Sequence, residues 1–63
     1  MKEITDFLVH LTNSKKLNYP RLVMYQDESG HIEYDDNDAY SRILFEFNSI
    51  EHLLERIQYF ELA

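Results

Sequence analysis

The sequence predicts one α+β domain in which an N-terminal and a C-terminal helix flank a three-stranded antiparallel meander, in the order α-β-β-β-α. Three observations lead to this prediction. Apolar residues recur at every second position in the middle of the chain, as in half-buried strands, and at every third or fourth position near both ends, as in amphipathic helices. In addition, residues 1–63 contain no linker, repeat or low-complexity segment, so they form a single small domain.

The first predicted helix covers residues 3–12. Its apolar residues fall on one helical face, and they are Ile4, Phe7, Leu8 and Leu11. Residues 12–14 are Thr, Asn and Ser, which favour turns, so the helix is expected to end there. We expect the apolar face to pack into the core.

The first strand is predicted at residues 21–26, after a connector at residues 17–20. Pro20 restricts the residue before it, so Tyr19 is expected to be extended. Residues 28–30 then form a three-residue hairpin loop in which Gly30 takes the left-handed conformation.

The second strand is predicted at residues 31–35, and the loop length determines how it pairs with the first strand. The expected pairs are Asp27 with His31, Tyr25 with Glu33, and Met24 with Tyr34.

The third strand follows a loop at residues 36–39 and begins at about Tyr40. At Asn48 the apolar period changes from two to about 3.6, which predicts a helix at residues 49–60. Asn48 is expected to cap this helix, with Glu51 reaching back to it as in a capping box. The apolar face of the helix consists of Ile50, Leu53, Leu54, Ile57 and Phe60.

The helices need an apolar surface, which one face of the sheet supplies. The expected core face carries Leu22, Met24, Ile32, Tyr34, Ile43, Phe45 and Phe47. The expected opposite face carries Val23, Tyr25, His31, Glu33, Asp35, Arg42, Leu44 and Glu46. This face has two interpretations of equal weight: an ordinary solvated face, or an interface in which bulky side chains lie among carboxylates.

A chain of this length buries a small core, and it has no cysteine to form disulfides. Five Tyr and four Phe offer large rings for burial, and self-association remains open. Tyr59 and Phe60 are expected to complete this domain's own core or to pack against a second copy, and both roles can hold at once. The lack of cysteine, of a secretion signal and of a long apolar run leads us to expect a cytoplasmic protein that does not span a membrane.

Charge is distributed unevenly along the chain, whose net charge is −6. Residues 1–21 contain four basic and two acidic side chains, a balance of +2. Residues 22–63 contain ten acidic side chains and two arginines, a balance of −8. Such a chain repels nucleic acid but attracts a basic partner, so the expected partner is a nucleic-acid-binding protein and not nucleic acid itself.

Metal, cofactor and catalytic motifs are not evident in the sequence. Residues 35–38 bring together several side-chain oxygens of the kind that bind calcium. They lack the turn glycine and the distal glutamate of an EF-hand loop, so a solvated turn explains them better. His10, His31 and His52 are scattered, with no nucleophile or orienting group assigned to them. We therefore expect no metal site, no cofactor and no enzymatic activity.

The hairpin RLVMYQDESGHIEY and the strand-to-helix run ILFEFNSIEHLLERIQYF, within a small, acidic, cysteine-free chain, resemble small phage-encoded inhibitors of the anti-CRISPR type. The resemblance is one of size, charge and element order. It implies an inhibitor in the host cytoplasm that docks on a nucleic-acid-binding effector. Its carboxylates would then take the place of phosphates in the basic groove of that effector.

Two functions are consistent with these observations: an inhibitor that acts by charge mimicry, or a small homodimeric structural or adaptor protein. For the inhibitor, Tyr25, Tyr34 and Tyr40 are the predicted non-electrostatic anchors. The full set of predicted partner-binding residues is Tyr25, Asp27, Glu28, Glu33, Tyr34, Asp35, Asp36, Asp38, Tyr40 and Glu46.

Overall fold

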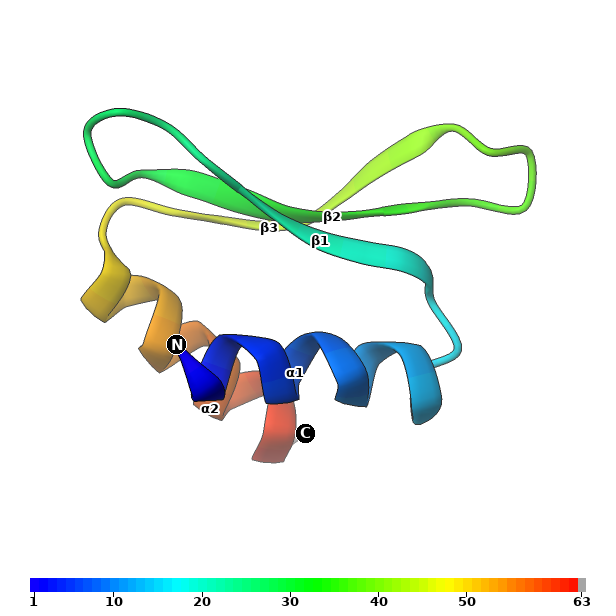
Figure 1. Ribbon diagram of the computed structural model, residues 1–63, viewed down its shortest axis with the longest axis horizontal. Coiled ribbons are helices and arrows are strands. Elements are labelled where there is room, and N and C mark those ends of the chain that lie inside the picture. Colours follow the sequence, from blue (N-terminus) through cyan, green and yellow to red (C-terminus); the bar gives the residue numbers. More distant parts are fainter. Residues whose placement is uncertain (63) are drawn as a thin grey trace.

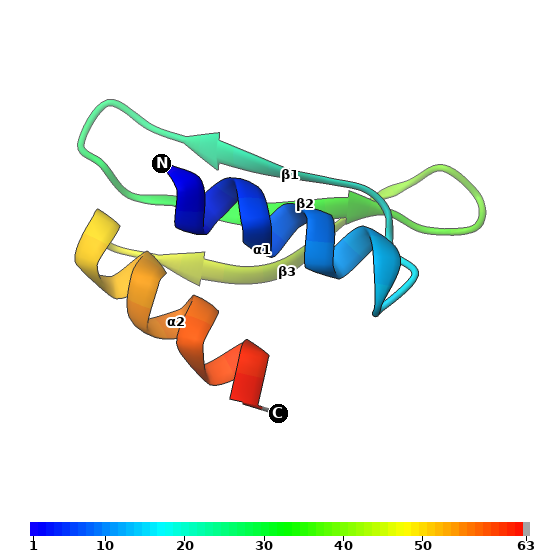
Figure 2. The ribbon, with the colours of Figure 1, turned by 60° about the horizontal axis from the view of Figure 1, so that its bottom comes forward.

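Both helices lie on the same side of a three-stranded sheet, which leaves the other face of the sheet without a covering layer (Figures 1 and 2). This computed structural model describes residues 1–62 and confirms the predicted element order. The elements are α1 (Lys2–Asn13), β1 (Asn18–Met24), β2 (Gly30–Asp35), β3 (Ser41–Phe47) and α2 (Ile50–Leu62). The sheet is antiparallel with strand order β1-β2-β3, as expected of a meander.

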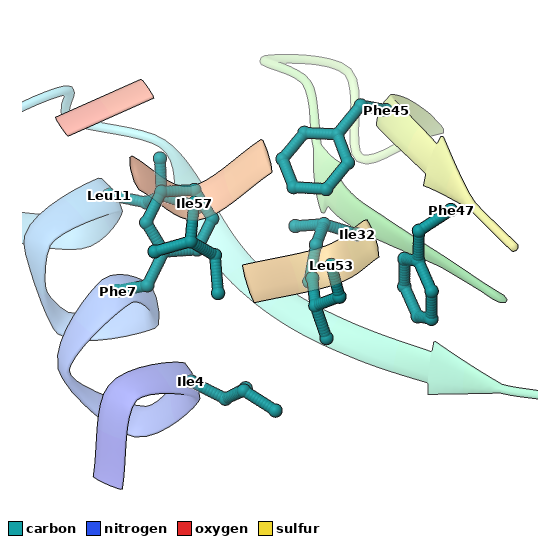
Figure 3. Packing of buried hydrophobic residues seen from close by; sticks show 8 residues of the cluster. All are labelled: Ile4, Phe7, Leu11, Ile32, Phe45, Phe47, Leu53 and Ile57. Atoms are coloured by element: carbon teal, nitrogen blue, oxygen red, sulfur yellow. The ribbon is translucent and has the colours of Figure 1, made fainter. Parts of the chain in front are cut away.

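The core lies between the helix layer and one face of the sheet (Figure 3). Phe7 and Leu11 of α1 and Leu53 of α2 are almost fully buried, as is Ile32 at the centre of the sheet. The remaining buried hydrophobic residues are Ile4, Phe45, Phe47 and Ile57. These residues follow the helical and strand periods of the sequence, so local periodicity correctly predicted most of the core.

Three aromatic rings, one each from α1, β3 and α2, connect both helices to the sheet within this core. The Phe45 ring centroid lies 6.1 Å from that of Phe7 and 5.1 Å from that of Phe60. The Phe7 and Phe60 centroids are also 6.1 Å apart. These are distances at which aromatic pairs attract one another beyond simple burial. Phe60 thus completes this domain's own core, whereas its neighbour Tyr59 is 72% exposed.

The N-terminal cap of α2 is one residue later than predicted. The Ser49 hydroxyl accepts a hydrogen bond from the His52 backbone N–H at 3.1 Å. In return, His52 Nδ1 accepts the backbone N–H of Asn48 at 3.1 Å. The prediction of Asn48 and Glu51 as the capping pair is therefore wrong, because Ser49 directly precedes the first helical residue and its side chain reaches the N–H three positions on.

The predicted register of the first hairpin is wrong. Met24 pairs with Gly30, Val23 with His31 and Leu22 with Ile32. The connecting loop spans residues 25–29 and is closed by the Tyr25 N–H, which donates to the Ser29 carbonyl at 2.8 Å. It is thus longer than the predicted three-residue loop, and each expected cross-strand pair is displaced.

The left-handed residue of this hairpin is Glu28, with φ of 69°, and not Gly30. Gly30 is needed for space. A Cβ at Gly30 would lie 2.1 Å from the Val23 carbonyl oxygen and 2.9 Å from the Phe47 ring. The only glycine of the chain therefore allows β1 and the Phe47 ring to approach β2 closely.

A β-bulge in β3 reverses two further expectations. Ile32 pairs with Phe45, but the next residue, Glu33, pairs with Ile43, so that Leu44 is an extra residue. Ile43, predicted in the core, is 56% exposed, whereas Leu44 is half-buried against the core. Met24, at the end of β1, is also exposed instead of buried.

The start of β1 differs from the prediction as well. The strand begins at Asn18 and contains an irregularity between Asn18 and Arg21. Tyr19, expected to be extended, has φ of 51°. This left-handed conformation is unfavourable for a bulky residue, particularly before a proline such as Pro20. It turns the Tyr19 ring outward, where it is 70% exposed.

We predict opposite effects for two substitutions in the first hairpin. Gly30→Ala should destabilise the protein by about 1–3 kcal/mol or more, since the added methyl group overlaps backbone and ring atoms. Glu28→Gly should be neutral or stabilise by up to about 1 kcal/mol, because glycine adopts φ of 69° without strain. Urea unfolding followed by circular dichroism measures both. A fully stable Gly30→Ala variant would contradict the observed register.

Candidate functional site

The uncovered face of the sheet is the candidate site, and it combines a paired ionic network with exposed apolar groups. Residues that pair across strands share a face, and faces alternate along each strand. The uncovered face therefore carries Arg21, Val23, His31, Glu33, Asp35, Ser41, Ile43 and Glu46. Arg42 and Leu44, predicted here, belong to the helix side because of the bulge.

Arg21 is the centre of the network on this face. Its guanidinium forms ion pairs with Glu33 and Asp35, the latter at 3.0 Å between Nη1 and Oδ1. It also donates to the Ser41 hydroxyl at 3.1 Å and to the Tyr19 carbonyl at 2.9 Å. One arginine thus connects the two edge strands through the carboxylates of the central strand.

The Arg21 guanidinium also lies over the Tyr19 ring, 4.8 Å from its centroid. This is a cation–π distance. The ring is held beside the uncovered face by this contact and by the hydrogen bond from Arg21 to the Tyr19 carbonyl. Tyr19 is therefore presented in a fixed position despite its exposure.

Tyr25 and His31 extend the network toward the first hairpin loop. His31 Nε2 lies 2.6 Å from Glu33 Oε1, and His31 Nδ1 lies 2.8 Å from the Tyr25 hydroxyl. An ionised carboxylate only accepts hydrogen bonds, so the His31 Nε2–H group donates a hydrogen bond to Glu33 Oε1. In the neutral ring, Nδ1 then accepts from the Tyr25 hydroxyl. Although its face of the sheet is uncovered, His31 is only 9% exposed, with the Tyr25 ring packed edge-on at 5.8 Å.

The network lowers the pKa of Glu33 below its ordinary value. The hydrogen bond from His31 is the largest cause, and the hydrogen bond and charge of Arg21 add to it. The carboxylate is consequently ionised at neutral pH and held in one position. A folded-state pKa below the unfolded value means that ionised Glu33 stabilises the fold above that value, and that this stabilisation is lost as pH falls.

Two of the other carboxylates are engaged in the loops. Asp36 accepts the backbone N–H groups of Asp38 and Tyr40, each at 2.9 Å, and it accepts Arg42 Nε at 2.8 Å. These interactions lower its pKa, with the Tyr40 hydrogen bond as the largest cause. Asp27 accepts the backbone and hydroxyl of Ser29, and the hydroxyl is the main cause of its lowered pKa.

The ten predicted partner-binding residues do not form one cluster. Glu33, Asp35 and Glu46 lie on the uncovered face, where Tyr25 packs on His31. The two loops carry the next group, at opposite ends of the sheet (Figure 1): Asp27 and Glu28 in the first loop, and Asp36, Asp38 and Tyr40 in the second. Tyr34 alternates with Glu33 on β2 and therefore lies on the helix side, where it lines a shallow depression with Lys16 and Leu17.

Sequence reasoning missed Tyr19, Arg21 and Ile43 as members of this surface. Arg21 was detectable from the sequence. It precedes Val23 by two residues in the same strand, and Val23 was already predicted on this face, so Arg21 must share that face. Tyr19 and Ile43 were not detectable, since both owe their exposure to backbone irregularities. Arg21 pairs with carboxylates of another strand, Glu33 and Asp35, whereas Arg42 pairs with Asp36 across the second loop.

Within residues 1–62, no group of three or more histidine and carboxylate side chains is positioned to hold a metal ion. In the same range, no buried side-chain nitrogen or oxygen lacks a hydrogen-bond partner. Neither helix in this part of the chain is long and apolar enough to cross a bilayer.

Comparison of the chain with protein-family models, curated proteins and solved structures finds no match.

We predict that Glu33→Gln reduces the acid sensitivity of the protein. The ordinary carboxyl value for Glu33 is 4.5, and its pKa in the folded protein is lower. The stabilisation it provides is present above pH 4.5 and disappears as pH falls through the lower value. The loss of stability between pH 7 and pH 3, measured by urea unfolding, should be smaller in Glu33→Gln than in the wild type. An equal loss of stability in the two proteins would show that ionised Glu33 does not stabilise the fold in this way.

Proposed function

We propose that this protein is a non-enzymatic protein-binding module that docks the uncovered face of its sheet onto a basic, nucleic-acid-binding partner and inhibits it. The observation that carries the proposal is the combination of exposed apolar side chains and a paired polar network centred on Arg21 and His31 on this single face. Tyr19, Tyr25 and Ile43 are 70%, 53% and 56% exposed. Aromatic and aliphatic anchors surrounded by polar groups are typical of binding hot spots.

Pre-organisation supports this role. Arg21 holds Tyr19 through a cation–π contact and a hydrogen bond, and His31 holds the Tyr25 hydroxyl. Side chains that are already ordered lose less conformational entropy when a partner binds. Tyr19 is in addition held with φ of 51°, a conformation that costs free energy in a bulky residue.

The charge of the protein supports a basic partner, but through only some of the carboxylates that the sequence suggested. Glu33 and Asp35 form ion pairs with Arg21 and so support the uncovered face, whereas Asp36 is paired with Arg42 at the second loop. Glu28, Asp38 and Glu46 are exposed and form no ion pair within residues 1–62. Together with the net charge of −6, they attract and orient a basic partner.

The resemblance to small phage-encoded inhibitors of the anti-CRISPR type supports the search for a nucleic-acid-binding effector as the partner. On this proposal the uncovered face, with the exposed carboxylates around it, occupies the groove in which the effector binds phosphates. Occupation of that groove would block nucleic acid without any chemical step by the inhibitor.

The docking face is tested by affinity capture from bacterial lysate, followed by measurement of binding to the captured protein. Ile43→Ala and Tyr25→Ala should each weaken binding by roughly tenfold or more, as expected for hot-spot residues. Val9→Ala is the matched control, because Val9 is 53% exposed on α1 in the opposite layer. Binding should also fall as salt is raised.

Charge reversal provides the second part of the same test. Glu46→Lys, on the uncovered face, should weaken binding more than Glu55→Lys, on α2. If the α1 and α2 variants weaken binding as much as the sheet variants, the docking face is wrong. A complex that is insensitive to salt would exclude the charge-based part of the proposal.

The exposed Tyr59 favours a second candidate function, a homodimeric adaptor that associates through α2. For this candidate, sedimentation at micromolar concentration should show a dimer for the wild type and a monomer for Tyr59→Ala. A wild-type monomer would exclude it.

A further inference from the structure

An apolar pocket of about 370 Å³ opens in the helix layer, separate from the uncovered face of the sheet. It is lined by Leu11 of α1, Leu17 of the following connector, Leu44 of β3 and Phe60 of α2, with Lys15 as its charged lining residue. The volume is in the range, about 300–1,000 Å³, in which small-molecule sites are found.

The divergence of the helices and the bulge in β3 together account for this pocket. The two helices run in the same general direction and separate toward their C-terminal ends (Figure 2). The bulge turns Leu44 to the helix side of the sheet, where it is only half-buried. Leu11, 1% exposed, contributes a rigid wall. The pocket thus has apolar walls from four different segments.

Lys15 makes the chemistry of the pocket asymmetric. It is exposed, and no carboxylate among residues 1–62 forms an ion pair with it, although the chain has twelve acidic residues. A hydrophobic pocket with an unpaired ammonium group among its lining residues is complementary to a molecule with an apolar body and one negative charge.

We propose that this pocket binds a free single-chain carboxylate, such as a medium-length fatty acid. The alkyl chain would lie among Leu17, Leu44 and Phe60, and the carboxylate would pair with Lys15. This site is independent of the proposed docking face, because it opens in the other layer of the fold and uses none of the docking residues.

The test is an NMR titration of the isotope-labelled protein with octanoate below its micelle concentration. Octanoate should produce saturable shifts at Leu11, Lys15, Leu17, Leu44 and Phe60. Octanol lacks the charge and should bind more weakly, whereas octylammonium, which repels Lys15, should bind most weakly. Shifts distributed over the whole surface, or equal affinity for octanoate and octylammonium, would overturn the proposal.

A pair of matched variants tests the role of the charge. Lys15→Gln should weaken octanoate binding about two- to fivefold, the range for a solvent-exposed ion pair. Lys2→Gln removes the same charge at the other end of α1 and should leave binding unchanged. Both side chains are exposed, so neither change threatens the fold. Equal weakening by the two variants would show only general charge attraction and would overturn the assignment of Lys15. Binding of octanoate to this pocket and docking of a protein to the sheet are measured separately, so either can fail alone.

Discussion

One-sided burial of the sheet is the constraint on which the rest of this structure depends. Two short helices provide apolar surface for a single face, and Phe7, Phe45 and Phe60 connect both helices to β3. The opposite face remains uncovered (Figure 1). Because an antiparallel sheet tolerates water on one side, the fold is complete without a third layer. Core packing therefore does not constrain the side chains of the uncovered face, and selection for function can act on them.

Most polar groups in the centre of the uncovered face are paired with one another. Arg21 joins Glu33 and Asp35, while His31 joins Glu33 to Tyr25. Carboxylates that are paired in this way are poor mimics of free phosphates, so their contribution to recognition is to fix the surface around Tyr19, Tyr25 and Ile43. Free negative charge is supplied by exposed side chains such as Glu28, Asp38 and Glu46. Within the proposed interface, anchoring and electrostatic attraction are thus assigned to different residues.

Much of the fold was predictable because its signals are local. The spacing of Ile4, Phe7 and Leu11 predicted α1 to within one residue at each end. The alternation of Phe45 with Phe47 correctly placed both rings in the core, and the change of period after Phe47 correctly marked the start of α2. The candidate site was less predictable. Its acidic members are visible in the sequence, but their pairing with Arg21 depends on a hairpin register that loop composition alone did not reveal.

The sequence by itself determined the order of the elements, the apolar stripe of each helix and the excess of negative charge. Tertiary structure decided which sheet residues face the core and which carboxylates are paired. The physical reason is that periodicity is a property of neighbouring residues, whereas register depends on contacts across strands. Gly30 stays in the strand because the Val23 carbonyl and the Phe47 ring leave no space for a side chain, and the bulge at Leu44 exchanges the faces of Ile43 and Leu44.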